Sequence, residues 1–356
     1  MAAKGEKIRF GIVGAGEVGP FHAEAISSLP NAQLVGVCDK VEERAKALAE
    51  KFNAKMWYTD YHKLLDREDV DVVNLCTPTF LNEEITLVAA NAGKHVIVEK
   101  PMASNLRQAD NMIAACRKAK VKLGAIFQTR FNEDVQLIKK TIDEGKLGKL
   151  FMGSAHAKFF RTKEYYEVGA WKKTWNGQGG GALINQGIHA IDLLQWFMGP
   201  VDSLYGFVDT VAHKMEVEDV AVASLKFKND AIGVIEGSTA VYPGFPRRVE
   251  ICGEKGSIII KVEDIELWAI TGSKIKVKGS LDKDYINKRA EDASLNPIHF
   301  SIKGHRLQIK DFIEAIREDR EPFVNGEEGR KTLEIVRAIY KSARIKREVG
   351  FPITEE

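Results

Sequence analysis

Short apolar runs alternate with amphipathic stretches over the first 125 residues of the chain. The runs are rich in Val, Ile and Leu, which is typical of buried strands. They cover 8–13, 33–38, 70–75, 96–98 and 122–127. Between them, apolar positions recur at helical spacing and predict helices over 21–29, 42–52, 83–92 and 106–119. Strands that alternate with helices in this way form βαβ units around a parallel sheet.

The pattern changes after residue 128. A predicted helix over 135–144 is followed by longer alternating runs, which are typical of an antiparallel sheet with one covered face. These runs are 151–158, 203–211, 220–226, 233–238, 248–252 and 257–261. Two amphipathic segments, 306–317 and 329–347, predict a final pair of helices. We therefore predict an α/β protein with a doubly wound parallel sheet in residues 1–128 and an α+β domain with a large, mostly antiparallel sheet in residues 129–356.

Length and composition support this division. A chain of 356 residues exceeds the usual size of a single core. Its 52 basic and 50 acidic residues give a net charge of +2, which argues against nucleic acid or a membrane surface as partner. The apolar runs are short of the roughly 20 residues that span a bilayer, and the first residues lack a secretory signal pattern. The cysteines form no C-x-x-C pair, so we expect buried thiols in a cytoplasmic protein: Cys38, Cys76, Cys116 and Cys252.

A glycine-rich turn directly follows the first predicted strand. Residues 14–19 read Gly-Ala-Gly-Glu-Val-Gly and open the first predicted helix. In that context Gly14 permits a tight turn, Gly16 lets the backbone approach a pyrophosphate, and Gly19 lets helix and strand pack closely. The helix N-terminus adds N–H groups and a positive dipole end. The pattern predicts a Rossmann domain whose dinucleotide is bound by Gly14, Ala15, Gly16, Glu17 and Val18.

An acidic residue stands where the ribose of such a cofactor binds. Asp39 follows Gly19 by 20 residues, at the end of the second strand. Its carboxylate accepts from a free 2′-hydroxyl and repels a 2′-phosphate, which favours NAD over NADP. Lys40 would pair with that phosphate and keeps NADP as the alternative. Later strand ends at the same sheet edge are expected to line the cofactor through Thr77, Pro78 and Gln128, and Gln128 would reach the nicotinamide ribose or the substrate.

Glu99, Lys100 and Pro101 end the apolar strand that begins at His95. The carboxyl edge of an open parallel sheet is where ligands bind, so we expect Glu99 and Lys100 at the cofactor. Proline fixes the turn, and an X-Pro bond is the main place for a cis peptide. The alternative is an ordinary strand end with a solvated lysine.

A second conspicuous segment runs from Gly179 to Asp192. Three glycines bring the backbone close to another group, and the helix that follows places Asn185, His189 and Asp192 on one face. A histidine between an amide and a carboxylate has the fixed orientation that general acid–base catalysis needs. The alternative is a core histidine bonded to its neighbours. A metal site is not predicted, because asparagine is a poor zinc ligand and the sequence offers no second His or Cys cluster.

Together these motifs resemble the Gfo/Idh/MocA family of sugar and polyol oxidoreductases. The resemblance covers nearly the whole chain and rests on residues 14–19, 76–78, 99–101, 179–192 and 253–256. It implies that Lys100 hydrogen-bonds the reacting hydroxyl and that the Lys100–Pro101 bond is cis. It also implies that His189 takes the hydroxyl proton as hydride leaves for the cofactor. Many members have Asp in place of Asn185, so Asn185 is expected to bind substrate rather than share the proton transfer.

The Asn185–His189 segment is similar to that of members that oxidise the C3 hydroxyl of nucleotide-linked amino sugars and related sugars. Aromatic rings stack on sugars, and arginine makes bidentate contacts to phosphate or carboxylate. Trp175 and Arg161 lie in the segment before the glycines and are therefore expected to bind substrate. We predict an NAD-dependent dehydrogenase of a pyranose secondary hydroxyl, C3 in a nucleotide-linked amino sugar or uronate.

Three alternatives stay open at this point. The first is an inositol or other polyol dehydrogenase, and the second is a glycosidase that oxidises C3 transiently. The third, a cofactor-sensing regulator without catalysis, is disfavoured by the presence of both Lys100 and His189. The resemblance further implies that the sheet of the second domain associates into a homodimer or homotetramer.

Overall fold

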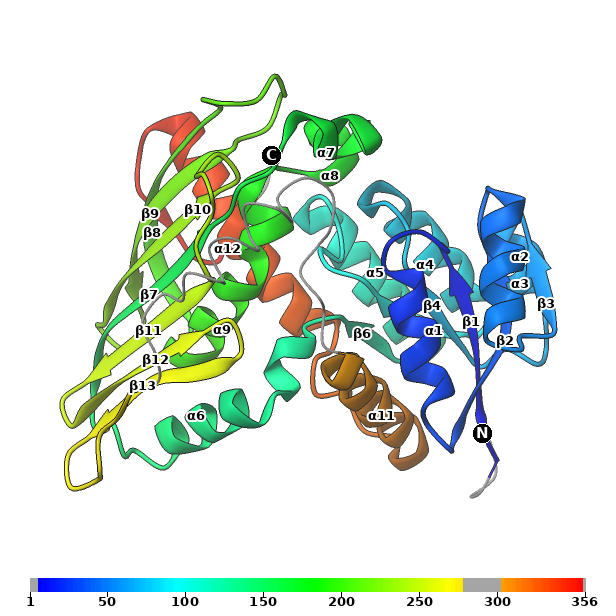
Figure 1. The fold of residues 1–356 in the computed structure, drawn as a ribbon, viewed down its shortest axis with the longest axis horizontal. Coiled ribbons are helices and arrows are strands. Elements are labelled where there is room, and N and C mark those ends of the chain that lie inside the picture. Colours follow the sequence, from blue (N-terminus) through cyan, green and yellow to red (C-terminus); the bar gives the residue numbers. More distant parts are fainter. Residues whose placement is uncertain (1–5, 278–301, 355–356) are drawn as a thin grey trace. The chain divides into compact units, whose positions relative to one another are not determined.

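The computed structural model describes residues 6–277 and 302–354, which divide into two units (Figure 1). The first comprises residues 6–128 and 302–331, and the second comprises residues 129–277 and 332–354. The sequence pattern predicted a single domain over residues 129–356. The structure differs over 302–331, because α11 (Ile302–Glu318) packs Ile309 and Phe312 into the core of the first unit. Within the described ranges, no helix has the length and apolar character needed to cross a membrane.

The first unit contains a parallel sheet, as predicted, and the sheet has six strands where five were predicted. Its strand order is β3-β2-β1-β4-β5-β6. The bounds are β1 Ile8–Val13, β2 Ala32–Cys38, β3 Met56–Tyr58, β4 Val72–Leu75, β5 His95–Val98 and β6 Leu123–Ala125. The order reverses between β1 and β4, so the carboxyl ends of these two strands form a switch point where ligands bind in doubly wound sheets.

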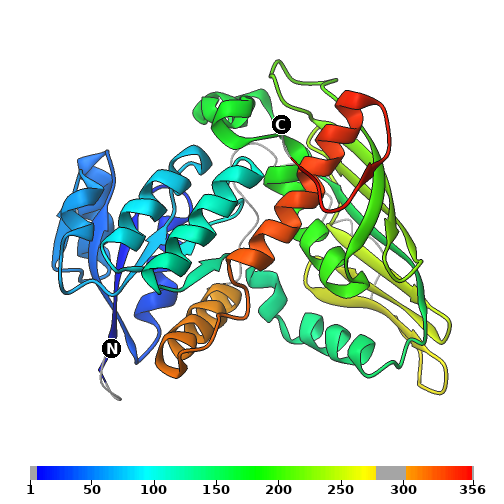
Figure 2. The same cartoon turned by 180° about the vertical axis from the view of Figure 1, so that it is seen from behind.

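Helices cover both faces of this sheet (Figures 1 and 2). On one face, α1 (Gly19–Ser27), α2 (Glu42–Lys51) and α11 share a buried apolar core with β1. On the other face lie α3 (Tyr61–Leu65), α4 (Asn82–Asn91) and α5 (Leu106–Ala119). Each fully buried Leu or Ile side chain in such a core stabilises the fold by about 1.5–3 kcal/mol. Burial on both faces explains why the strands read as continuous apolar runs.

The second unit contains a nine-stranded sheet, mostly antiparallel as predicted, in the order β14-β13-β12-β11-β7-β10-β9-β8-β15. Only the β7–β10 pair is parallel among its described strand pairs. The bounds are β7 Leu150–Lys158, β8 Val201–Asp209, β9 Val220–Phe227, β10 Ile232–Ser238, β11 Arg248–Gly253, β12 Gly256–Lys261, β13 Asp264–Ile270, β14 Lys276–Val277 and β15 Val349–Gly350.

Several helical segments of the second unit carry residues of the candidate site. A π-helical turn, η4 (Leu183–Gly187), runs directly into α9 (Ile188–Met198), and both pack on one face of the sheet. The other helical segments are α6 Glu133–Asp143, α7 Lys163–Val168, η3 Ala170–Lys173, α8 Trp175–Gln178 and the later part of α12 Gly326–Ile345. The opposite face of the sheet carries exposed apolar side chains, among them Phe207, Val222 and Ile232.

Candidate active site

The glycine loop joins β1 to α1 in the first unit. Gly14 has a φ of +102°, and a Cβ built on it would lie 2.4 Å from the carbonyl oxygen of Cys76, just after β4. A Cβ on Gly19 would lie 2.4 Å from the carbonyl oxygen of Gly14. Around Gly16, an added Cβ meets no atom of the described residues within 4 Å. Close packing therefore requires Gly14 and Gly19, whereas the backbone at Gly16 is open to a pyrophosphate.

Asp39 connects the expected ribose position to this loop. Its Oδ2 accepts a hydrogen bond from the backbone of Ala15 at 2.7 Å, and its Oδ1 accepts from Val41 at 2.9 Å. The carboxylate therefore stands beside the glycine loop and restrains it. Lys40 is exposed next to it. Gln128, which was also expected to touch the cofactor, is 5% exposed, and its Oε1 has no hydrogen-bond partner among the described residues. A buried amide oxygen of this kind suits a ligand donor.

The ends of β4 and β5 are tied together by an asparagine, Asn82, that belongs to none of the predicted motifs. The hydroxyl of Thr77 donates to Oδ1 of Asn82 at 2.8 Å. Nδ2 of Asn82 in turn donates to the carbonyl oxygens of Pro101 and Met102, both at 3.3 Å. Asn82 thus holds the turn that follows Lys100. Only the fold brings residues so far apart in sequence together, so no local pattern could have identified this role.

The segment after β5 has the predicted cis bond between Lys100 and Pro101. Lys100 is partly exposed at the carboxyl edge of the sheet. Glu99 is 7% exposed, and its carboxylate accepts from the backbone N–H of Lys100 at 3.0 Å and from His22 at 2.9 Å. Both carboxylate oxygens of Glu99 therefore accept hydrogen bonds inside the first unit. Any contact of Glu99 with a cofactor would be made by its backbone.

In the second unit, the triple glycine lies against a buried glutamate. Glu218 accepts hydrogen bonds from the backbone of Gly181 at 2.7 Å, from the backbone of Leu183 at 2.8 Å and from the hydroxyl of Tyr340 at 2.9 Å. A Cβ on Gly180, whose φ is +159°, would lie 2.2 Å from the Tyr340 hydroxyl oxygen. Burial raises the pKa of Glu218 to about 7, against the effect of these donors. The glycines thus bring the backbone close to Glu218 and Tyr340.

His189 lies in the first turn of α9, after the π-helical turn, and is 4% exposed. The sequence predicted one continuous α-helix here and missed the π-helical turn, a feature that often occurs at functional sites. Asn185, within that turn, donates to the hydroxyl of Tyr165 at 3.2 Å. The carboxylate of Asp192 accepts from Arg130 at 2.7 and 2.9 Å and from the hydroxyl of Thr332 at 2.9 Å. Asp192 is therefore anchored in a buried ion pair.

Tyr165 gathers several of the residues expected to bind substrate. Its hydroxyl accepts from Asn185 and Gln186, and Gln186 also accepts from the guanidinium of Arg161 at 3.0 Å. The Arg161 guanidinium lies 5.2 Å from the centre of the Tyr165 ring, and Nζ of Lys172 lies 4.4 Å from it. Arg161 and Lys172 are 5% and 8% exposed, so the cluster holds two largely buried cations.

Tyr165 and Lys172 belong to sequence segments rich in aromatic and basic residues, but composition alone could not distinguish them from their neighbours. Trp175, which was also expected to bind substrate, is 39% exposed. Its ring packs edge-on against that of Tyr340, with 5.1 Å between the ring centres.

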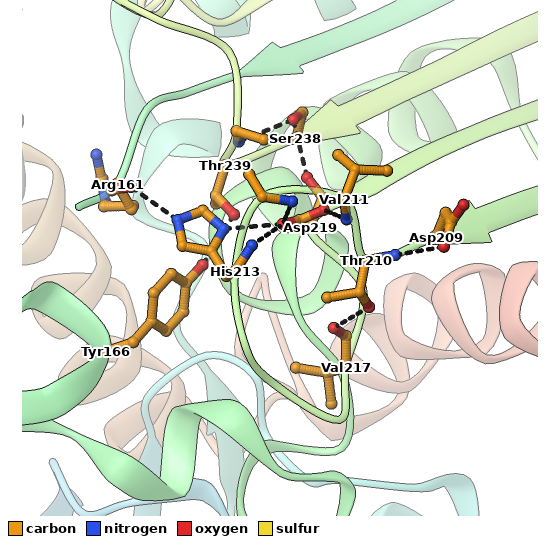
Figure 3. Close-up of polar contacts among 12 residues, drawn as sticks. Arg161, Tyr166, Asp209, Thr210, Val211, His213, Val217, Asp219, Ser238 and Thr239 are labelled. Carbon is orange, nitrogen blue, oxygen red and sulfur yellow. Dashed lines mark hydrogen bonds and ion pairs between the residues drawn. The ribbon is translucent and has the colours of Figure 1, made fainter. Parts of the chain in front are cut away.

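A second buried carboxylate holds the backbone of Arg161 in place (Figure 3). Asp219 accepts from the backbone N–H groups of Val211 and Ala212 at 2.8 Å and from Nδ1 of His213 at 2.9 Å. Nε2 of the same histidine lies 2.9 Å from the carbonyl oxygen of Arg161. Burial alone would raise the pKa of Asp219, but these donors lower it below its ordinary value. The neighbouring residues Glu218 and Asp219 thus restrain two different segments of the candidate site.

The chain matches two models of one protein family. Residues 8–127 match the model described as the oxidoreductase family, NAD-binding Rossmann fold, and residues 139–351 match the C-terminal alpha/beta domain of the same family. These matches make the protein an oxidoreductase with an NAD-binding domain.

Individual relatives are similar over most of their length. The WlbA dehydrogenase from Bordetella pertussis, solved in complex with NADH and UDP-GlcNAcA, is 32% identical with a TM-score of 0.87, and the match covers 99% of this chain and 100% of that one. The myo-inositol 2-dehydrogenase of Thermotoga maritima is 29% identical over 96% of this chain and 98% of its own length. The D-glucoside 3-dehydrogenase of Escherichia coli is 32% identical over 70% of this chain and 75% of its own.

Proposed function

The chain belongs to the Gfo/Idh/MocA family of NAD-binding oxidoreductases, and we propose that it oxidises a secondary hydroxyl of a pyranose. The residues of the first unit fit a dinucleotide, since the backbone at Gly16 is open and Asp39 stands at the end of β2. The glycine loop and the start of α1 would hold the pyrophosphate, and Asp39 the adenosine ribose. NAD, when bound, supplies the acceptor for hydride.

The observation that carries this proposal is the position of Lys100. It follows β5 at the same sheet edge as the glycine loop after β1, and parallel neighbours place both strand ends at that edge. We assign its ammonium group to hydrogen-bond the reacting hydroxyl and stabilise charge that develops on the oxygen. His189, largely buried at the start of α9, is assigned to accept the hydroxyl proton.

Three observations support a sugar linked to UDP as the substrate class. Arg161 and Lys172 place two cations beside Tyr165, a combination that suits an acidic or phosphorylated sugar. Trp175 exposes part of an aromatic ring in the same unit. The WlbA dehydrogenase, similar over the whole chain, was solved with UDP-GlcNAcA. We therefore propose a UDP-linked uronate, oxidised at C3, as the preferred substrate.

The test is a comparison of NADH formation with UDP-GlcNAcA, UDP-GlcNAc, myo-inositol and glucose. Lys100→Met is expected to abolish turnover and to leave the affinity for NADH unchanged. Lys94→Met is the matched control, because Lys94 lies just before the same strand, at its opposite end, and donates to the carbonyl oxygen of Arg67. Turnover by Lys100→Met, or loss of NADH binding in that variant, would contradict the role of Lys100.

Inositol oxidation is the second candidate, supported by similarity to the myo-inositol 2-dehydrogenase of Thermotoga maritima over 96% of this chain. The same lysine and histidine would act on a ring hydroxyl in both cases. The substrate comparison separates the two, since a higher kcat/KM for myo-inositol than for UDP-GlcNAcA selects this candidate. Release of free sugar without accumulation of NADH would instead indicate a glycosidase that oxidises C3 transiently.

We also propose that the protein forms a homodimer or homotetramer in the cytoplasm. The exposed Phe207, Val222 and Ile232 supply an apolar surface on the sheet of the second unit. The four free cysteines, three of them buried, suit a reducing compartment. Light scattering coupled to gel filtration measures the oligomeric state, and a monomer would contradict this part of the proposal.

A further inference from the structure

Three side chains from separate elements meet in the interior of the first unit. His22 comes from α1, Glu99 follows β5, and His305 comes from α11. Nε2 of His22 lies 2.9 Å from Oε1 of Glu99, and Nε2 of His305 lies 3.6 Å from the same oxygen. The three side chains are 0%, 7% and 3% exposed, respectively. They therefore form a buried cluster, here called the His–Glu–His cluster.

The hydrogen bonds of His22 show how this cluster is held. Nδ2 of Asn74 in β4 lies 2.8 Å from Nδ1 of His22. An amide nitrogen only donates, so Nδ1 of the ring accepts and the proton of a neutral ring sits on Nε2, facing Glu99. Burial lowers the pKa of His22, which favours this neutral ring. A metal ion would need the lone pair of Nε2, so the geometry favours a hydrogen-bonded cluster over a metal site.

The other oxygen of Glu99 fixes the start of the functional segment. Oε2 accepts from the backbone N–H of Lys100 at 3.0 Å. One oxygen of the carboxylate thus faces two histidines and the other restrains the peptide that carries Lys100. Burial would raise the pKa of Glu99, but the hydrogen bond from His22 and the nearby ring of His305 lower it well below its ordinary value, so the carboxylate stays charged.

We propose that His22, Glu99 and His305 are positioning residues that set the direction in which Lys100 leaves the sheet. This inference rests on the role of Lys100 in the proposed function. α11 comes late in the chain, and its apolar packing in the first unit brings His305 to this cluster. Since His22 lies on the helix that begins at Gly19, the cluster links Lys100 to the element that follows the glycine loop.

The variants are chosen to separate positioning from stability. His305→Ala removes the ring nitrogen that lies 3.6 Å from Glu99, and His305→Gln restores a nitrogen near the position of Nε2. Glu99→Gln alters the shared acceptor, and it keeps the experiment decisive if a histidine variant fails to fold. His95→Ala is the matched control, because His95 lies at the opposite end of β5 and its ring accepts from the backbone of Lys122 at 2.9 Å.

The first measurement needs no substrate. Amide hydrogen exchange of Lys100 is followed by NMR in full-length protein labelled with ¹⁵N-lysine. We expect exchange to be at least about fivefold faster in His305→Ala and Glu99→Gln, as expected for a weakened hydrogen bond. It should return toward the wild-type rate in His305→Gln and stay at that rate in His95→Ala.

The second measurement uses the best substrate of the NADH comparison, deuterated at the reacting carbon. Misplacement of a reacting group by about 1 Å costs on the order of 100-fold, so a smaller shift in His305→Ala is expected to lower kcat about tenfold. The KM for NAD should not change, and the isotope effect on kcat should rise as hydride transfer becomes limiting. A loss of stability alone would change neither the KM for NAD nor the isotope effect on kcat.

Two results would overturn the inference. The first result is that His305→Ala and Glu99→Gln have the same Lys100 amide exchange rate and the same kcat as His95→Ala. The other is stoichiometric zinc in the purified protein whose removal by a chelator abolishes activity, since the cluster would then be a metal site. Turnover by Lys100→Met contradicts the proposed function instead, and the exchange measurement still decides whether the cluster restrains Lys100.

Discussion

The carboxylate of Glu218 accepts the backbone N–H of Gly181 at 2.7 Å, and the backbone of the same glutamate leaves no room for a side chain at position 181. A Cβ there would lie 1.9 Å from the carbonyl oxygen of Glu218. Gly181 stands just before the π-helical turn that leads to His189. Glu218 therefore holds the segment that leads into the helix of the proposed base.

Gly181→Ala is expected to lower the free energy of unfolding by about 3 kcal/mol, because backbone atoms cannot move aside as a flexible side chain can. Urea denaturation measures the change. Gly187→Ala is the control in the same segment, since its Cβ would meet the nearest atom at 3.5 Å, an ordinary contact. That variant should keep its stability or gain up to about 1 kcal/mol. Equal losses in both variants would contradict the packing argument.

Glu218 also makes the stability of the protein depend on pH. Burial raises its pKa from 4.5 to about 7, so the folded state favours the protonated carboxyl. The stability from this group is fully present below pH 4.5 and is lost as the pH rises through about 7. The linkage corresponds to about 3 kcal/mol at most. Urea midpoints measured from pH 5 to 8 should fall in the wild type and fall less in Glu218→Gln. Parallel curves would refute the assignment.

Most strands of both sheets could be predicted from the sequence because apolar runs and alternation are local properties. Strands without such a pattern were missed, such as the three-residue β3 (Met56–Tyr58) and the half-exposed β13 (Asp264–Ile270). The apolar stripe of α11 predicted that its face is buried. It did not indicate which unit covers it, because a stripe specifies burial and not the partner.

The candidate site shows the same limit. The glycines at 179–181 predicted a close approach of the backbone, but the residue approached, Glu218, lies 37 positions after Gly181. His22 and His305 carry no motif at all, and only the fold brings them to Glu99. Motifs thus indicated the residues proposed to touch ligands, whereas the residues that restrain them needed the structure.

Asp39→Ala should weaken NADH binding about tenfold, because the proposed charged hydrogen bond to the ribose would contribute roughly 1.5–3 kcal/mol and the bond to Ala15 is lost as well. The affinity for NADPH should fall less, since the carboxylate also repels a 2′-phosphate. Fluorescence titration with both cofactors measures the two constants. Glu50→Ala removes an exposed acid from α2 and should leave both unchanged. An unchanged ratio of the two affinities in Asp39→Ala would remove Asp39 as the discriminating residue.

Asp219→Asn should raise the KM for the sugar substrate and leave the affinity for NADH unchanged. The amide cannot accept from Val211, Ala212 and His213 together, so the bond from His213 to the carbonyl oxygen of Arg161 is weakened. Removal of a buried acceptor from these donors also costs about 1–3 kcal/mol of stability.

Asp209→Asn is the control, because Oδ1 of Asp209 accepts only from the adjacent Thr210 among the bonds described. Kinetics and urea unfolding of both variants measure these effects. If Asp219→Asn loses stability but keeps its KM, the contact of Asp219 with His213 supports the fold and does not position Arg161.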